Sequence, residues 1–328
     1  MFRILGEGLE ADHVKNSAME AENHVKCGAS SKSLMNRVNL FRKLFVVILF
    51  AALCSTAVVM AQNEISLEFA DDVFIEEQLA FMEEIIKLHD EIKNIHKSLE
   101  KLYPISVINS GHFFIFDLND AGSKYEFKLK VASPMPIPDD MSILAAFPLE
   151  FYDMKPSAVI SKDILKVPEN YIFIFHEFVH CYQWDNGEQE IRKGLTVEKQ
   201  EMAKNNHSWE LNFPFPYNSE YFINKTMELT GSFTLENAVQ YHESMKSYLQ
   251  EIEFEYMIWQ QWKEGFARYV ENLVRNKIGL KLNTTIVTTP LDRVCFYEIG
   301  SKYIELLMNK NSELDNDIVE LFYKMKMN

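Results

Sequence analysis

A helix-length apolar segment that contains three ionisable side chains restricts the fold of this chain more than any other sequence feature. Residues 171–184 are apolar on nearly every side, which predicts a buried helix. The same segment contains His176, Glu177 and His180. Buried polar groups of this kind destabilise a fold unless each finds a partner. The rest of the chain is therefore expected to supply partners for this cluster.

The three residues form an H-E-x-x-H pattern, which is typical of a zinc site. On a helix, His176 and His180 lie one turn apart on the same face, so their imidazoles can bind one zinc ion. Glu177 would then serve as the catalytic general base on a zinc-activated water. The alternative is a pair of hydrogen-bonded core histidines without a metal.

A catalytic zinc site also needs a third protein ligand and an open fourth position. Glu264 is the best candidate, because it lies on a second apolar helix where Gly265 and Ala267 would allow close approach to the first helix. Arg268 lies one turn further along, where it would either orient Glu264 or form an exposed ion pair. Two other histidines are alternative third ligands: His207 and His242.

The two segments together, HEFVH at residues 176–180 and EGFARYVEN at residues 264–272, resemble the gluzincin metallopeptidases. In that family a glutamate on a later helix completes the H-E-x-x-H site. The resemblance implies zinc ligands at His176, His180 and Glu264, with Glu177 as general base. The second segment is similar to that of aminopeptidase-N-like members, but 83 residues separate His180 from Glu264, where that pattern has about eighteen. An exopeptidase activity is therefore not implied.

The long spacing predicts an insertion over residues 185–255 between the two ligand-bearing helices. We expect this insertion, whose residues 188–212 are polar and read as irregular, to shape or cover the cleft. The oxyanion donor stays open among five residues: Tyr217, Tyr221, His242, Tyr297 and Tyr303. Tyr269 lies about 140° round the helix from Glu264, which favours a packing role.

The sequence also leaves open the state of two cysteines, Cys181 and Cys295, which either form a disulfide or remain buried thiols. Cys181 lies off the ligand face of its helix, so no catalytic role is expected for it.

The remaining pattern predicts an α+β fold: a long N-terminal helix and a small β-sheet, then a mainly helical, zincin-like half. Residues 64–102 carry apolar side chains at helical spacing. Short β-rich runs follow at residues 105–108, 112–116, 125–131 and 157–161, with a hairpin turn at 119–122 and a loop at 133–140. Pro156 suggests an edge strand for the last run, where an extended peptide could pair, but we favour the alternative of an ordinary strand within the sheet.

Beyond residue 169 the chain is mainly helical. Residues 185–187 should end the H-E-x-x-H helix. Further helices are predicted at residues 218–229, 235–251, 255–278, 301–308 and 313–325.

The first 61 residues are expected to lie outside the fold. Residues 35–61 combine a basic flank, an apolar run at 44–61 and a small-residue end, which are the parts of a secretory signal peptide. The same run would act as a membrane anchor if it were retained. Residues 1–34 read as an over-extended start or a disordered leader. We therefore expect an exported protein of the periplasm, cell envelope or extracellular space, with one metallopeptidase-like domain over residues 62–328.

The charge balance excludes one broad class of function. With 48 acidic and 33 basic side chains, the net charge of −15 argues against nucleic-acid binding, which needs a basic face. The sequence predicts a zinc metallopeptidase that acts on a peptide or protein. Two alternatives remain: a zinc amide hydrolase with a non-peptide cell-envelope substrate, and a non-catalytic envelope binding protein. The oligomeric state is not indicated.

Overall fold

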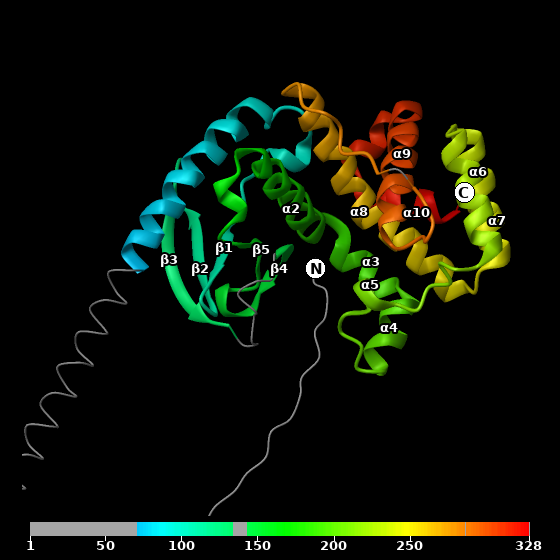
Figure 1. The fold of residues 1–328 in the computed structure, drawn as a ribbon, viewed down its shortest axis with the longest axis horizontal. Coiled ribbons are helices and arrows are strands. Elements are labelled where there is room, and N and C mark those ends of the chain that lie inside the picture. Colours follow the sequence, from blue (N-terminus) through cyan, green and yellow to red (C-terminus); the bar gives the residue numbers. More distant parts are fainter. Residues whose placement is uncertain (1–70, 134–142, 286, 328) are drawn as a thin grey trace, which may run out of the picture. The chain divides into compact units, whose positions relative to one another are not determined.

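The structure, a computed structural model, describes the chain in three stretches: residues 71–133, 143–285 and 287–327. Gln78–Asn328 belong to one compact unit; the other unit, Gly6–Glu77, is described only from residue 71. The first unit is α+β, as expected, with a five-stranded sheet followed by a mainly helical part (Figure 1).

The expected leader at residues 1–34 and the signal peptide or anchor at residues 35–61 lie outside the described stretches. Among the helices that are described, none has the length and apolar character needed to cross a membrane.

The long N-terminal helix ends earlier than the sequence predicted. Residues 71–92 are helical, and the prediction of a helix to residue 102 is wrong beyond that point. The His96 side chain is the local reason: it accepts a hydrogen bond from the backbone N–H of Ser98 and so begins a separate 3-10 turn, η1 (Lys97–Leu99). The buried side chains of Met82, Ile85 and Ile92 anchor the helix on the core.

Five strands form one mixed sheet in the order β3-β2-β1-β5-β4, in which only β1 and β5 pair in parallel. Their bounds are β1 Ile105–Asn109, β2 His112–Leu118, β3 Tyr125–Ala132, β4 Leu144–Leu149 and β5 Lys155–Ser161. The predicted hairpin turn is confirmed, since the N–H of Gly122 donates to the carbonyl of Asn119 at 2.8 Å and Gly122 has a positive φ of 67°.

The strand predicted at residues 157–161 exists as β5, and the favoured alternative, an ordinary strand within the sheet, is confirmed, whereas the suggested edge position is wrong. β5 lies between β1 and β4, so the edge on this side is β4, which the sequence did not predict. Two alanines and Pro148 weaken the β pattern of this strand. A proline is tolerated there because an edge strand does not need every N–H for the sheet. Most of the loop predicted at residues 133–140 lies outside the described stretches.

Nine α-helices of the described residues follow the sheet, joined by shorter helical turns. They are α2 Tyr171–Gln183, α3 Gln189–Gly194, α4 Thr196–Ala203, α5 Trp209–Asn212, α6 Glu220–Gly231, α7 Leu235–Tyr248, α8 Glu251–Lys277, α9 Val294–Lys310 and α10 Ile318–Met327. The short turns are η2 Glu150–Tyr152, η3 Ile164–Lys166, η4 Pro168–Asn170, η5 Trp184–Glu188 and η6 Ser312–Asn316. α8 begins earlier than predicted because Gln250 and Glu253 form a capping box.

The predicted end of the H-E-x-x-H helix is confirmed: α2 ends at Gln183, and Gly187 in the following π-helical turn η5 has non-helical backbone angles. The prediction that residues 188–212 are irregular is wrong, because α3, α4 and α5 lie within them. The polar side chains that read as irregular pair with one another: the Arg192 guanidinium donates to Glu198 and Glu210, each at 2.7 Å, and to Glu188 at 3.1 Å. These ion pairs explain why a polar sequence is ordered here.

α8 packs against both α2 and α9 and so connects the two sides of the helical part (Figure 1). Gly265 faces α9 and not α2, because a Cβ at this position would lie 2.6 Å from the carbonyl carbon of Gly300. The expectation that Gly265 lets α8 approach the H-E-x-x-H helix is therefore wrong. Its small size allows close packing with α9 instead.

Candidate metal centre

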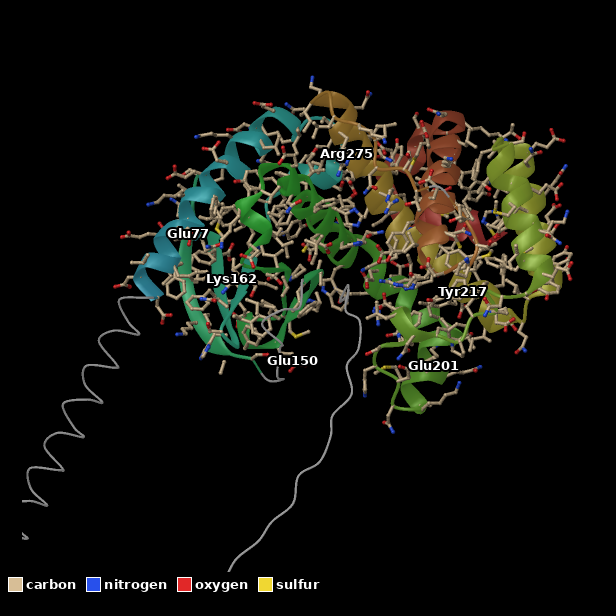
Figure 2. All side chains as sticks on the ribbon, viewed as in Figure 1. Glu77, Glu150, Lys162, Glu201, Tyr217 and Arg275 are labelled. Atoms are coloured by element: carbon tan, nitrogen blue, oxygen red, sulfur yellow. The ribbon has the colours of Figure 1, made fainter. Side chains whose placement is uncertain are left out.

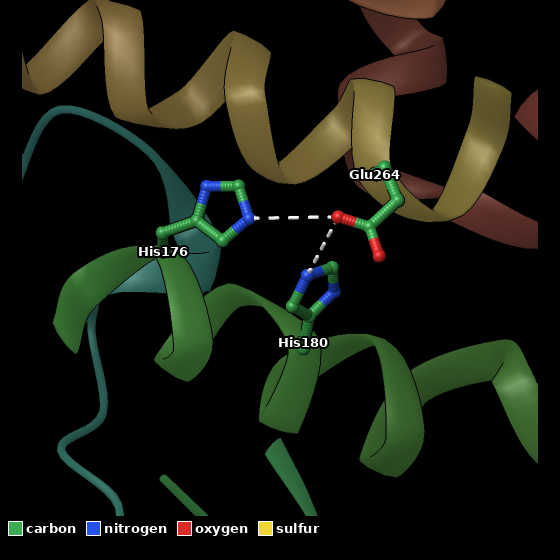
Figure 3. Close-up of side chains that lie close together, drawn as sticks. All are labelled: His176, His180 and Glu264. Atoms are coloured by element: carbon green, nitrogen blue, oxygen red, sulfur yellow. Dashed lines mark ion pairs between the residues drawn. The ribbon is translucent and has the colours of Figure 1, made fainter. Parts of the chain in front are cut away.

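Two helices bring the predicted ligands to one point. α2 presents His176 and His180 on the face toward α8, and α8 presents Glu264 between them (Figure 3). The Nε2 atoms of His176 and His180 lie 3.8 and 3.6 Å from Glu264 Oε2. One potential donor atom from each of the three residues lies within 4.8 Å of the others, and all three side chains are buried. The pattern in the sequence thus corresponds to a cluster in space.

Each histidine is held by a hydrogen bond at its other ring nitrogen. His176 Nδ1 lies 3.0 Å from Glu271 Oε2, and His180 Nδ1 lies 2.8 Å from Gln183 Oε1. Both partners are acceptors, so Nδ1 carries the proton and donates in each case. Each Nε2 then faces the centre of the cluster, where a metal ion would take the place of any proton that this nitrogen carries.

These partners are themselves fixed by neighbouring groups. Arg275 lies near the end of α8 (Figure 2). It donates to Glu271 Oε1 at 2.7 Å, and Asn283 donates to the same oxygen at 2.8 Å. Gln183 Nε2 donates to the carbonyl of Trp262 at 3.3 Å, which sets the orientation of its amide. The imidazole rings are therefore positioned by two layers of hydrogen bonds.

The electrostatics of the cluster favour a cation at its centre. Burial alone would lower the pKa of His176, but the adjacent carboxylates of Glu264 and Glu271 raise it to about 9. Burial would raise the pKa of Glu264, yet the two imidazoles hold it well below its usual range. Burial would also raise the pKa of Glu271, but His176 and Arg275 lower it to about 2. Both carboxylates are therefore ionised at neutral pH.

A small cavity opens beside the cluster. Its described lining consists of Leu144, Phe173, His176, Glu177, His180, Glu264, Arg268, Glu271, Asn283, Arg293 and Tyr297. Glu177 is buried at its wall, and among the described residues its carboxylate takes part in no hydrogen bond or ion pair. A carboxylate in this setting is available to a molecule that enters the cavity.

Of the five oxyanion candidates, only Tyr297 is part of this described lining. His242 bonds to Gln261 Oε1 at 2.7 Å and stacks on Tyr303, so both lie in the core. Tyr217 packs against Phe296, and Tyr221 stacks on Tyr248. Neither His242 nor the exposed His207 joins the cluster, which excludes both as the third ligand.

Arg268 is buried, so the alternative of an exposed ion pair is wrong. Its Nη1 donates to Thr285 Oγ1 at 2.9 Å and lies 3.9 Å from Glu298 Oε2. The side chain reaches the cavity that Glu264 also lines. The role of orienting Glu264 stays a prediction.

The two cysteines are free thiols, which excludes the disulfide alternative. Both are buried, and burial raises the pKa of the Cys181 thiol well above its ordinary value. Cys181 is therefore an inert core residue, in line with its position off the ligand face.

The insertion over residues 185–255 contributes none of the described lining of the cavity. The expectation that the insertion shapes the cleft is wrong for this cavity. The insertion instead anchors the ligand helix from behind, where the buried Lys263 ammonium pairs with the Glu188 carboxylate.

The sequence reasoning missed Glu271, Gln183 and Asn283, which hold the histidines in place. Two of them had a signal in the sequence. Glu271 lies seven residues after Glu264, two helical turns along the same face, and Gln183 lies three residues after His180. Asn283 comes from the segment after α8, and only the fold brings it to Glu271.

Comparison of the chain with protein-family models, with curated proteins and with solved structures found no match. The interpretation of the site therefore depends on its own geometry and chemistry.

Proposed function

We propose that this protein is an exported zinc-dependent metallopeptidase of the gluzincin type, which hydrolyses peptide bonds. One observation carries the proposal. Two imidazoles from α2 and a carboxylate from α8 converge beside a cavity that also exposes Glu177. Three protein ligands with an adjoining cavity are typical of catalytic zinc sites, whereas structural sites have four.

The residues present fit a zinc ion. The donor set of two nitrogens and one oxygen is one that zinc accepts, and the Nδ1 hydrogen bonds leave both Nε2 atoms available. In a tetrahedral zinc site, donor atoms lie roughly 3.3 Å apart. The observed separations of 3.6 and 3.8 Å from Glu264 Oε2 need only a small adjustment.

Each residue of the cavity then has a separate task. A bound zinc ion would supply Lewis acidity toward water and the peptide carbonyl. Glu177 accepts a proton from the attacking water and passes it to the leaving amine. Tyr297, which also lines the cavity, would donate a hydrogen bond to the carbonyl oxygen as charge develops there. Glu271 keeps His176 oriented through its Nδ1–H.

The edge strand β4 provides a way to hold a peptide. Leu144, its first residue, lines the cavity, and within the described sheet β4 pairs only with β5. An extended substrate can therefore add to the outer side of β4 through backbone hydrogen bonds. The peptide-pairing role that the sequence suggested for residues 157–161 is therefore proposed for residues 144–149 instead.

The experiment is a comparison of metal content and peptide hydrolysis in the full-length protein and three variants. We expect about one zinc per chain in the wild type, loss of zinc in His180→Ala and Glu264→Ala, and retained zinc without hydrolysis in Glu177→Gln. Zinc that persists in Glu264→Ala would contradict the three-ligand site.

Activity on cell-wall fragments without activity on peptides would favour the amide hydrolase. Zinc together with inactivity on both substrate classes would favour a binding protein.

A further inference from the structure

Two arginines share the cavity with the metal cluster. Arg268 and Arg293 line it together with Tyr297, and each guanidinium carbon lies 5.5 Å from the centre of the Tyr297 ring. One aromatic ring thus contacts both cations. Arg268 lies on α8 and Arg293 directly precedes α9, so two separate segments place positive charge at one wall.

Both guanidinium groups are charged. Burial would lower the pKa of Arg293, but Tyr297 and Glu264 raise it above its ordinary value. Glu298 Oε2 lies 3.9 Å from Arg268 Nη1, and Glu298 Oε1 also pairs with Lys302 at 3.0 Å. Arg268 and Arg293 thus bring two positive charges to this wall of the cavity, where they would attract an anionic group of a ligand that enters it.

The spacing along α8 relates this wall to the metal cluster. Arg268 lies four residues after Glu264, so the two side chains leave the same face about 6 Å apart along the helix axis. Consecutive α-carbons of a peptide are about 3.8 Å apart. When a substrate carbonyl lies at the cluster, the next residue of the substrate falls within reach of the guanidinium groups.

We propose that Arg268 and Arg293 bind a carboxylate that the substrate carries on the residue directly after the scissile bond. The planar guanidinium group matches a carboxylate in shape and donor geometry. The carboxylate has two sources: the free C-terminus of the substrate, or an Asp or Glu side chain at that position. This inference rests on the proposed function and adds a substrate class to it.

The first test uses three peptides that differ only in the residue after the scissile bond: a free acid, its C-terminal amide, and an amide with Glu at that position. We expect kcat/KM for the free acid, the Glu peptide or both to exceed that of the neutral amide at least tenfold. The preferred peptide identifies the source of the carboxylate. Equal cleavage of all three would overturn the inference while leaving the proposed function intact.

Two variants of Arg293 test whether the arginines of the cavity cause the preference for a carboxylate. Arg293→Met should reduce the preference to within about twofold, mainly through a higher KM, and Arg293→Lys should restore part of it. Lys310→Met is the matched control, since it removes an exposed positive charge from the end of α9, outside the described cavity lining. An unchanged preference in a folded Arg293→Met protein, or an equal loss in Lys310→Met, would overturn the assignment.

A binding measurement tests the carboxylate site without requiring catalytic activity. Calorimetry on Glu177→Gln, with and without zinc, compares N-acetylglycine with N-acetylglycinamide. We expect the acid to bind at least tenfold more tightly in both forms, and Arg293→Met to remove the difference. Equal binding of acid and amide would overturn the carboxylate site. Arginine-dependent binding in a protein that neither binds zinc nor cleaves peptides would overturn only the proposed function.

Discussion

Two buried charge clusters lie on different sides of α8, and consecutive residues of the helix belong to them. Lys263 pairs with Glu188 in a network that also includes Arg192, whose guanidinium donates to Glu198 and Glu210. Glu264, about 100° further round the helix, faces His176 and His180. In the first cluster cations and anions of the protein pair with one another. In the second, lone pairs converge beside a cavity that also exposes Glu177.

This difference is the reason for proposing a structural role for the first cluster and a chemical role for the second. Burying charge costs free energy, and a network of ion pairs offsets that cost within the protein. Two histidines whose Nε2 atoms point at a carboxylate would offer donors to a cation. Burial and charge are common to both clusters; only the second brings its possible metal donors together beside a cavity.

The largest effect on activity is expected from a substitution of Glu177, whose side chain lines the cavity. Glu177→Gln should lower kcat by roughly a thousandfold, because the amide cannot accept the proton. Zinc content and the urea unfolding midpoint should stay unchanged. Steady-state kinetics measures kcat, metal analysis measures the zinc content, and urea unfolding measures the midpoint. Full activity in the variant would remove Glu177 from the mechanism.

A large loss of stability, rather than of activity, is expected from a substitution in the ion-pair network around Lys263. Lys263→Met leaves the buried Glu188 carboxylate without its ammonium partner, which should cost about 3 kcal/mol of unfolding free energy. Urea unfolding measures this loss, and the double variant Lys263→Met/Glu188→Gln should recover part of it. If Lys263→Met instead abolished activity at full stability, the division between the two clusters would fail.

A smaller effect, on zinc affinity, is expected from the residues that hydrogen-bond to the histidine ligands. Glu271→Gln weakens the hydrogen bond to His176 Nδ1 and should lower zinc affinity roughly tenfold to a hundredfold. Competition with a zinc chelator measures the affinity. An affinity equal to that of the wild type would show that Glu271 does not orient the ligand.

The smallest effect is expected at an exposed histidine outside both clusters. His207→Ala should leave zinc affinity within twofold and stability within roughly 0.5 kcal/mol of the wild type. The same chelator titration and urea unfolding check this variant. A loss of zinc here would mean that the third ligand had been assigned to the wrong residue.

The sequence predicted the parts of the site that lie on regular helices. Helical spacing placed His176 and His180 on one face, and an apolar helix pointed to Glu264. It did not predict β4, whose alanines and Pro148 are explained only by its edge position. It read residues 188–212 as irregular because their ion pairs join residues from different helices. It assigned Gly265 to the wrong neighbour, since both sides of α8 are buried and periodicity cannot tell α2 from α9.

The most direct test of the account is the location of zinc in crystals of the full-length protein, by anomalous diffraction at the zinc absorption edge. The account predicts one strong peak bounded by His176 Nε2, His180 Nε2 and a Glu264 carboxylate oxygen, and no peak in the network around Lys263. A peak held by four protein side chains, or zinc bound away from Glu264, would contradict it.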